Sequence, residues 1–566
     1  MGLITSVVST SEDVSEADRR APLRSAFSMG FKAGFLTLAL WFLVRLGGFA
    51  PFPPESAFLY FTSIVPASVE EPAVQSLGEL AGLLGLLVAA LAIAAVYGLL
   101  AIVFERYWVP FTRGRSLSDF SGMLAFSLVP WLLFGAIVFP LTGSSFFGVG
   151  SDFAAADSAW AFPLTIILFQ LLWVVLLWGR MRPLLALKLA APGGATEVQV
   201  PKDVARREFV VRAFVYAGAG ILVLASLGTA LGTLISEGGL LSGESILPGT
   251  SIDTQNEPAI FMDPRLGTLV GSEVTSNDSF YRVAIDVFDP GVDVSTWSLA
   301  VTGLVGRPKT YSLDDLKALP KSTEYDTFIC VSNLVNGDLI SNAEWGGVKL
   351  SDLFADAGGV DSGATYVVFY SFDGYSVGVP LSRALSPNTM LAYEMNGVDL
   401  PQRHGYPLRA VIPGLYGMMS AKWVRGVQLT DSTFVGYWQT RGWTNDATVQ
   451  TVSFIRVPQD GVTVSLSQNG GTVMLGGVAF AGDRGISKVE VSVDGGSTWQ
   501  EATLKPSVSK LSWVLWAFEW TPSKTGNYLV YARATDGGGS VQTSAAADSF
   551  PSGATGYAVS AVDVAS

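Results

Sequence analysis

Long apolar runs dominate the first part of the chain. Five of them are long enough to cross the roughly 30 Å hydrocarbon layer of a membrane as helices. They cover residues 33–51, 77–104, 120–141, 160–177 and 213–235. Beyond residue 235 the apolar runs are short and alternate with polar residues, and Gly, Asn and Asp separate them, which is typical of strands joined by turns. This pattern predicts a multidomain membrane protein, with an N-terminal five-helix transmembrane region and β-rich domains after it.

The same pattern divides the chain into five parts. They are a cytoplasmic tail (1–32), the transmembrane region (33–235), a linker rich in Gly, Ser and Glu (236–256), an α+β domain (257–446) and an all-β sandwich (451–566). In the α+β domain short strands alternate with a few helical segments, one of which begins at a capping Ser312. The last part has strands at regular spacing and Gly-rich turns, which predicts an immunoglobulin-like fold without a Cys pair.

Lys and Arg residues indicate the orientation in the membrane. The loops at 52–76 and 142–159 contain neither, whereas the segments on the other side are rich in both. Because basic loops stay in the cytoplasm, we expect a multi-pass cell-membrane protein whose N-terminus is inside and whose last domains are extracytoplasmic. Arg206 and Arg207 resemble a twin-arginine export signal, although Ala205 precedes them and a plain basic flank explains them equally well.

The predicted membrane region offers little chemistry of its own. It contains no histidine, which excludes haem binding by His pairs there, and we interpret it as an anchor and docking surface. The net charge of −13 falls entirely after residue 235, because the residues before it hold equal numbers of acidic and basic side chains. An acidic outer part excludes nucleic acid as a partner, since a phosphate backbone requires a basic face.

Candidate chemistry begins at Cys330, the only cysteine in the chain, which therefore has no intrachain disulfide partner. A buried filler is the plainer interpretation, because unpaired Cys is among the most buried residue types. However, Cys330 ends a β-rich apolar run, and Ser332, Asn333 and the pair Asn336-Gly337 then supply turn chemistry. A thiolate at a strand end can face a site, and soft thiolates are metal ligands, so a metal or cofactor is expected nearby.

A second candidate site is the segment at 391–429, which holds the only histidine of the chain. A single His beside Gly and Pro is more often a structural turn residue, and an isolated Arg is often a surface charge. Here, however, the basic residues cluster in an otherwise acidic domain and alternate with Gly and Pro; they are Arg403, His404, Arg409, Lys422 and Arg425. Tight turns bring backbone N–H groups close, and Arg binds phosphate oxygens in pairs. The segment therefore predicts a cradle for a phosphate-bearing cofactor.

Several motifs occur in one order along the outer part. They are SFYRVAIDVFDPGVDVSTWSLAVTGLVGRP, FICVSNLVNGDLISNAEWGGVKLSDLF, LAYEMNGVDLPQRHGYPLR and GYWQTRGW. In these motifs the chain resembles the sulfite oxidase family of molybdenum enzymes, in particular its membrane-attached prokaryotic members. The resemblance implies a sulfite-oxidase-type molybdopterin domain in which Cys330 binds molybdenum directly and the dithiolene of molybdopterin holds it otherwise. The last part resembles the dimerisation domain of the same family, which implies a homodimer.

The resemblance also implies roles for individual residues. Positions that contact the pterin and its phosphate in the family are occupied here by Asp278, Tyr281, Arg282, Ser371, His404, Arg409, Ser420, Ala421 and Lys422. Trp345 and Tyr393 match side chains that line the substrate pocket and, with Cys330, form the implied catalytic set.

One departure from the family concerns the substrate. Leu334 and Val335 stand where the resemblance implies arginines that hold the sulfite anion. Each charge-assisted hydrogen bond contributes roughly 1.5–3 kcal/mol, so two missing contacts predict weak sulfite binding. We therefore expect a membrane-anchored molybdenum oxidoreductase that transfers an oxygen atom and reduces a small S- or N-oxide. The alternatives are sulfite oxidation and a non-catalytic scaffold of the same fold.

The expected reaction also needs an electron partner. The chain has no evident ligand set for haem or an iron–sulfur cluster. Electrons are therefore expected to come from an unidentified partner, which is a cytochrome, a copper protein or a quinone-linked subunit.

Overall fold

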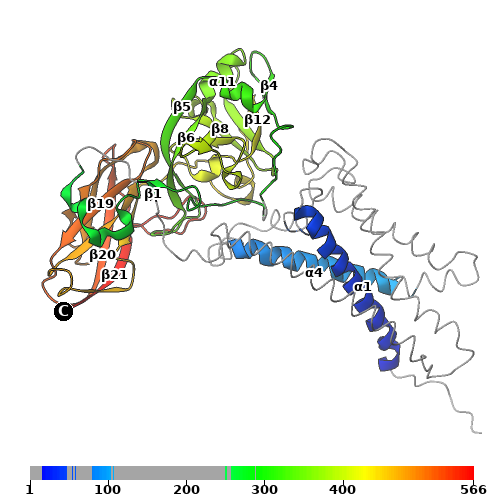
Figure 1. Cartoon of the computed structure of the whole chain (residues 1–566), viewed down its shortest axis with the longest axis horizontal. Coiled ribbons are helices and arrows are strands. Elements are labelled where there is room, and N and C mark those ends of the chain that lie inside the picture. The colour runs from blue at the N-terminus through cyan, green and yellow to red at the C-terminus, as the bar shows by residue number, and fades with distance from the viewer. Residues whose placement is uncertain are drawn as a thin grey trace, which may run out of the picture. The chain divides into compact units, whose positions relative to one another are not determined.

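The computed structural model describes residues 16–46, 54, 58, 79–103, 106, 249–250, 257–286 and 289–566. The chain forms two compact units, one of Met1–Phe61 with Leu80–Leu234 and one of Thr62–Glu79 with Ile235–Ser566. Figure 1 labels the main described helices and strands of each unit.

The described part of the first unit is helical. Its helices are α1 (Glu16–Leu46) and α4 (Glu79–Val103). Over the described residues, only Leu84–Val103 is both long and apolar enough to cross a membrane, because the apolar part of α1 is limited to Ala26–Phe42. The prediction of a five-helix transmembrane region is therefore wrong: the described chain supports at most one candidate span. Arg45 explains the difference in α1, since it lies inside the predicted run 33–51 but beyond the apolar part that ends at Phe42.

Part of the membrane prediction falls where the structure gives no description. The runs at 120–141, 160–177 and 213–235, together with Arg206 and Arg207, lie outside the described residues.

The second unit begins, in its described part, with segments that pack on strands far along the sequence. Two short 3₁₀ helices, η4 (Ala259–Met262) and η5 (Pro264–Leu269), precede β2 (Val274–Thr275), which pairs with β1 (Gly249–Thr250). A Cβ at Gly476 would lie 2.7 Å from a methyl carbon of Leu269, so η5 rests directly on strand β15 (Val473–Phe480). Residues at the start of the predicted α+β domain thus pack against the predicted sandwich.

Residues 297–446, here called the mixed domain, contain two five-stranded sheets. One sheet has the order β10-β9-β6-β5, with β11 also paired to β9, and the other has the order β4-β3-β12-β7-β8. The first sheet comprises β5 (Lys321–Ile329), β6 (Ile340–Lys349), β9 (Met390–Met395), β10 (Val398–Asp399) and β11 (Arg409–Val411). The second comprises β3 (Leu299–Gly303), β4 (Lys309–Tyr311), β7 (Tyr366–Ser371), β8 (Ser376–Pro380) and β12 (Val424–Thr430).

Helices in the mixed domain are short connectors. They are α10 (Leu313–Lys317), α11 (Leu350–Asp356), α12 (Leu381–Ala384), η6 (Gln402–His404), η7 (Gly417–Met419) and η8 (Gln439–Arg441). Ser312 caps α10 through a reciprocal pair of hydrogen bonds with Asp315, which is the cap that the sequence predicts. The domain is mostly β, and its catalytic and binding candidates lie in the loops that join the strands.

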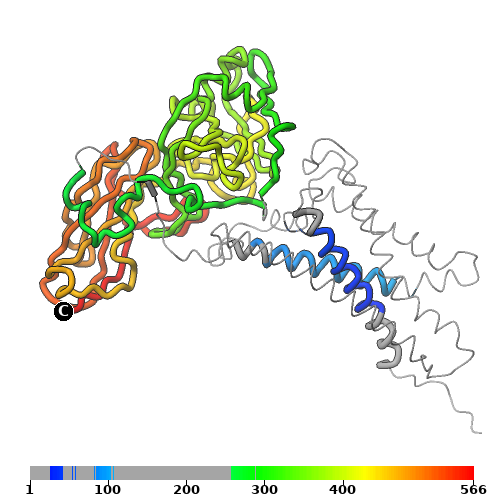
Figure 2. Tube along the Cα trace, in the orientation of Figure 1, coloured from blue at the N-terminus to red at the C-terminus, as the bar shows by residue number. Residues whose placement is uncertain are grey.

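Residues 451–566, here called the sandwich, form two further sheets. Their orders are β13-β15-β19-β18 and β14-β21-β20-β16-β17. The strands are β13 (Val452–Val457), β14 (Val462–Ser465), β15, β16 (Ile486–Ser492), β17 (Gln500–Glu501), β18 (Thr503–Leu504), β19 (Val514–Trp520), β20 (Gly526–Asp536) and β21 (Ala558–Ala565), with η9 (Gly482–Arg484) between β15 and β16. Figure 2 shows these strands, orange to red, gathered together in the trace.

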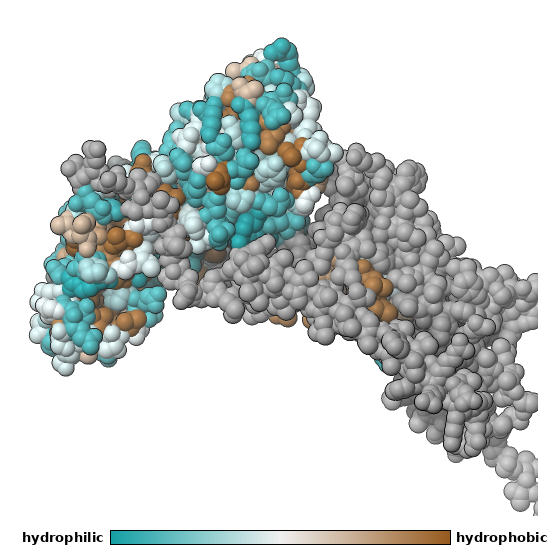
Figure 3. Space-filling view, viewed as in Figure 1, coloured by the Kyte–Doolittle hydropathy of each residue, from teal (hydrophilic) through white to brown (hydrophobic). Residues whose placement is uncertain are grey.

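The mixed domain and the sandwich share one hydrophobic core. Phe454, Met474, Trp513 and Leu515 of the sandwich belong to the same buried cluster as the core of the mixed domain. Trp513 Nε1 donates to the carbonyl of Glu273 at 3.1 Å. On the face in Figure 3, hydrophobic residues of these domains are scattered among hydrophilic ones. Side chains from both domains therefore form one interior.

Candidate active site

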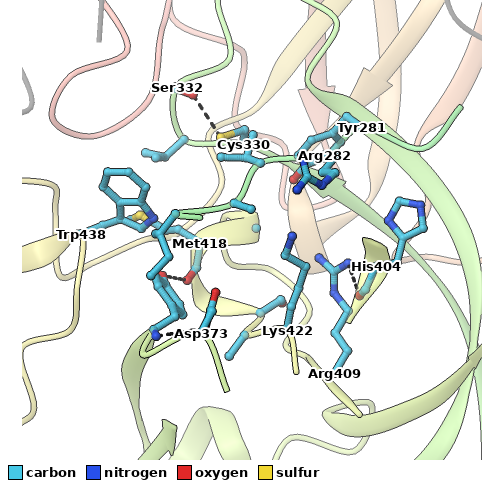
Figure 4. A pocket seen from close by; sticks show the side chains of 18 of the residues that line it. Tyr281, Arg282, Cys330, Ser332, Asp373, His404, Arg409, Met418, Lys422 and Trp438 are labelled. Carbon is cyan, nitrogen blue, oxygen red and sulfur yellow. Dashed lines mark hydrogen bonds between the residues drawn. The ribbon is translucent and has the colours of Figure 1, made fainter. Parts of the chain in front are cut away.

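A cleft with about 1010 Å³ of empty space, part of it open to solvent, lies in the mixed domain. Cys330, His404, Arg409 and Lys422 line it, with Tyr281 and Arg282 from the segment before β3 (Figure 4). The cleft thus joins the two segments that sequence analysis had singled out separately, the strand end at Cys330 and the basic segment after β9.

Cys330 follows the last residue of β5 and is 7% exposed. Its N–H donates to the carbonyl of Leu339 at 2.9 Å, which closes the β5–β6 hairpin around the loop between them. Its Sγ lies 3.1 Å from the Ser332 hydroxyl. A sulfur at a strand end that lines the cleft is a candidate soft metal ligand.

Arg409 is buried on the floor of the cleft, at the start of β11. Its guanidinium donates to the carbonyl of His404 at 3.1 Å and lies over the rings of Phe328 and Trp345, 4.6 and 5.1 Å from their centroids. Burial lowers the pKa of Arg409 to about 10, so the group stays charged near neutral pH. Its Nε has no hydrogen-bond partner among the described residues.

Lys422 places a second cation beside Arg409. Its Nζ is buried without a hydrogen-bond partner in the described chain and lies 4.2 Å from the centroid of the Trp423 ring. Burial, with a further contribution from the positive charge of Arg282, lowers the pKa of Lys422 to about 7. Burial raises the pKa of the nearby Asp373 carboxyl to about 6. Burial is the main cause of both shifts, so the cleft holds a cation and a carboxyl group that their surroundings solvate poorly.

His404 is held as a neutral donor. Its Nε2 lies 2.6 Å from the carbonyl oxygen of Asn277, and because a carbonyl can only accept, Nε2 carries the proton. Burial, and then the charge of Arg409, lower the pKa of His404 well below its usual range. The single histidine is therefore an uncharged imidazole whose Nδ1 is an acceptor.

Close backbone approach shapes the other side of the cleft. A Cβ at Gly417 would lie 2.4 Å from the Tyr281 hydroxyl, so only glycine leaves room for that side chain. Arg282 pairs with Asp289 at 2.6 Å. Ser420 accepts from the N–H of Ile412 at 3.3 Å. Ala421, which also lines the cleft, accepts from the N–H of Ala410 at 2.8 Å.

Five predicted site residues do not line this cleft, and one of them, Arg425, lies in β12. Asp278 is exposed in a turn, and its neighbour Asn277 supplies the contact to His404 instead. Ser371 is buried at the end of β7, and its Oγ has no partner among the described residues. Trp345 and Tyr393 are buried core residues of β6 and β9. Trp345 contacts the site indirectly, because its ring packs against the guanidinium of Arg409.

Sequence reasoning missed several lining residues. They are Asp373, Tyr375, Met418, Trp438 and Trp443. Trp438 and Trp443 lie in the motif GYWQTRGW and Met418 lies in the segment at 391–429, but neither feature shows that these side chains reach the cleft.

A second, smaller cavity, which Cys330 also lines, is formed by its loop and the sandwich. We call it the chamber; it holds about 290 Å³ of empty space, part of it open to solvent. Of the described residues that line it none is charged, and they include Leu334, Val335, Phe454 and Tyr416. Asn333, which is 5% exposed, also lines it, and its Nδ2 is buried without a partner in the described chain. The chamber therefore offers an apolar wall and one unused donor beside the thiol.

The cleft fits an anionic organic cofactor. The unpartnered Nζ of Lys422 and Nε of Arg409 are buried donors that a phosphate would satisfy, and leaving such groups unsatisfied is costly. The nearby thiol supplies a soft metal ligand. Buried cationic donors beside a thiol define the class of site: one that fits a phosphate-bearing cofactor together with a soft metal.

Comparison with known proteins identifies the family. The family profile described as oxidoreductase molybdopterin binding domain matches residues 286–438, and the profile described as Mo-co oxidoreductase dimerisation domain matches residues 441–550. Sulfite oxidase of Arabidopsis thaliana is 31% identical over 341 residues, which cover 50% of this chain and 85% of the plant protein. The chain belongs to the sulfite oxidase family of molybdopterin oxidoreductases. The predicted molybdenum–molybdopterin cofactor is thereby confirmed.

Two other similarities mark the extent of the match. Mitochondrial sulfite oxidase of Rattus norvegicus is 32% identical over 328 residues, which cover 50% of this chain and only 59% of the rat protein. The crystal structure of the sulfane dehydrogenase SoxCD from Paracoccus pantotrophus aligns with a TM-score of 0.44 and 23% identity, over 54% of this chain and 85% of that one.

Proposed function

We propose that the protein reduces a small, uncharged S- or N-oxide, with Cys330 as the protein ligand of molybdenum. When bound, the cofactor supplies oxygen-atom transfer and two-electron redox chemistry. Overall, the oxide, two electrons and two protons give the reduced compound and water. The electrons come from a separate carrier, which is a cytochrome, a copper protein or a quinone-linked subunit.

The observation that carries this proposal is the uncharged lining of the chamber beside Cys330. A dianion in such a cavity would lose its hydration without gaining a counter-charge, which is strongly unfavourable. A neutral oxide loses less, and its oxygen can accept from the unused Nδ2 of Asn333. Leu334 and Val335, which replace the arginines implied by the family, belong to this lining.

The remaining site residues act on the cofactor side. Lys422 and Arg409 are placed to hold its phosphate, and His404 is fixed by the carbonyl of Asn277 so that it presents Nδ1. Burial raises the pKa of Tyr281 well above its usual range, so its hydroxyl keeps its proton and can donate. These groups orient the pterin and exclude water.

The test is a comparison of two reactions on one preparation. Steady-state assays should give a larger kcat/KM for reduction of a dialkyl sulfoxide or an amine N-oxide, with an artificial donor, than for oxidation of sulfite. Asn333→Asp keeps the oxygen that accepts from Leu339 N–H at 2.9 Å but loses the Nδ2 donor. It should therefore lower kcat/KM for the oxide on the order of 10- to 100-fold. An unchanged value would remove Asn333 from the proposal.

Sulfite oxidation is the second candidate. It is favoured by relatives named sulfite oxidase at 31–32% identity and by the cationic side chains of the cofactor cleft. Rapid turnover of sulfite at low micromolar KM, with slow turnover of oxides, would establish it and overturn the preference for oxides.

We also propose that the catalytic part is attached to a membrane, on its extracytoplasmic side, and forms a homodimer. Supporting these points are the candidate span Leu84–Val103, the uneven distribution of Lys and Arg in the first 235 residues, and the match to a dimerisation-domain profile. Protease added to intact cells should then digest the part after residue 257, and survival of that part would contradict the location.

A further inference from the structure

The loop that follows Cys330 is held firmly at its base. Cys330 N–H donates to the carbonyl of Leu339, and Leu339 N–H donates to Oδ1 of Asn333, both at 2.9 Å. Gly337 fits against Asn333 so closely that a Cβ would lie 2.5 Å from that Oδ1. These contacts lie within the β5–β6 hairpin. They do not fix the tip of the loop, residues 336–338, which is held by other parts of the chain.

Arg456 of sandwich strand β13 holds the tip. Its NH1 donates to the carbonyl of Asn336 and its NH2 to the carbonyl of Gly337, both at 2.8 Å. NH1 also lies 3.7 Å from Oδ1 of Asp338, and the Arg456 side chain is only 11% exposed. The planar guanidinium therefore donates to two consecutive carbonyls at once. The ammonium group of lysine, a single nitrogen, does not reproduce this geometry.

Asn336 makes the complementary contacts from the loop side. Its Oδ1 accepts from the N–H of Ile455 on β13 at 2.9 Å, and its Nδ2 donates to the carbonyl of Val559 on β21 at 2.8 Å. Its φ of +62° is left-handed, a conformation that Asn adopts more readily than most residues. Two strands of the sandwich thus bind one loop residue.

We propose that Arg456 and Asn336 form a clamp through which the sandwich positions the Cys330 thiol. With base and tip both fixed, the loop has little freedom to carry the thiol away from the cleft. The sandwich then contributes to the active site of its own chain. Arg456 is a positioning residue, because it acts through the loop backbone. Its importance for the metal rests on the proposed function, but its effect on the thiol does not.

The single cysteine allows a direct test. Because Cys330 is the only thiol in the chain, alkylation by iodoacetamide reports on it alone. In the full-length protein without cofactor, Arg456→Met and Asn336→Gly should each raise the alkylation rate about tenfold or more. Glycine accepts the left-handed φ, so Asn336→Gly removes the side-chain contacts without straining the backbone. Arg456→Lys, which keeps the charge without the fork, should give an intermediate rate.

A matched control comes from the same sandwich. Arg533 also pairs with a carboxylate, Glu490 at 2.9 Å, and lies over an aromatic ring, that of Trp499 at 4.1 Å. Arg533→Met should leave the alkylation rate unchanged. The proposal fails if both clamp variants alkylate at the wild-type rate, if the control accelerates equally, or if the acceleration only follows a lower thermal midpoint. Loss of activity without a change in thiol reactivity would also refute the clamp, while leaving the proposed reaction intact.

Discussion

At the residue scale, the cleft is defined by the buried cationic side chains of Arg409 and Lys422. Cys330 and the basic segment around His404 could be predicted from the sequence, because residue type alone marks a single thiol and a cluster of cations in an acidic domain. Asp373 and Tyr375 could not, since only packing brings them to the cleft. Asp278 shows the opposite error: the segment was right, but the contact comes from the carbonyl of Asn277, which no side-chain pattern reveals.

The burial of Lys422 predicts that the stability of the cofactor-free protein depends on pH. The pKa of Lys422 is lowered to about 7 in the folded state, against roughly 10.5 in an unfolded chain. Between these values the unfolded state binds more protons, so stability rises with pH, and below about pH 7 the full cost of burying the cation is felt. Lys422→Met should therefore be more stable than wild type near pH 7. The difference in stability between the two proteins should become smaller towards pH 9.5.

Thermal unfolding followed by circular dichroism at several pH values measures this gap. Keeping the pH above 7 limits interference from Asp373, whose pKa is about 6 and whose effect has the opposite sign. A gap that does not change with pH would mean that Lys422 is not the titrating group. Added phosphate should stabilise wild type at pH 7 and have little effect on the variant.

At the scale of elements, strands and turns were predictable but their pairings were not. Alternating residues and the Ser312 cap indicated elements that the structure contains. Sheet order, such as β10-β9-β6-β5, depends on contacts between segments far apart in sequence, which a local pattern cannot report. Helix α1 shows how an apolar count misleads, because one charged residue within a run shortens the part that could cross a membrane.

The β6–β9 pairing gives a prediction at this scale. The register shifts between Gly346 and Gly347, and a Cβ at Gly347 would lie 2.1 Å from the carbonyl oxygen of Leu391. Gly347→Ala should lower the free energy of unfolding by about 1–3 kcal/mol, as overpacking typically does. Gly363→Ala is the control, since the nearest atom to its Cβ is at 3.9 Å, and it should change stability by less than about 0.5 kcal/mol. Urea denaturation measures both, and equal effects would contradict the close contact.

At the scale of the whole molecule, the mixed domain and the sandwich are joined by more than a linker. Thr327 N–H donates to the carbonyl of Leu511 at 3.1 Å, and its Oγ1 accepts from the N–H of Trp513 at 2.9 Å. The sequence predicted a boundary near residues 446–451 because the composition changes there. The sequence could not reveal that η5, which precedes the mixed domain, packs on strand β15 of the sandwich.

The shared core predicts how fragments behave. A fragment of residues 257–566 should unfold in one cooperative transition, because both domains bury the same cluster. A fragment of residues 257–446 lacks Trp513 and Leu515 and should not unfold cooperatively. Calorimetry of the two fragments measures this. Independent folding of the shorter one would show that the shared core adds little to stability.

This shared core also bears on how the chain is inherited. The two family profiles meet between residues 438 and 441, so a recombination event there could exchange one matched region without cutting into the other. Yet a sandwich acquired from a distant lineage would lack side chains that match this chain's η5 and the loop after Cys330. It would lose contacts such as those that Trp513 makes with Glu273 and Arg456 makes with Asn336. Selection would remove such a chimaera unless both sides changed in concert. The pair is therefore expected to descend as one heritable module, with substitutions on the two faces correlated across lineages.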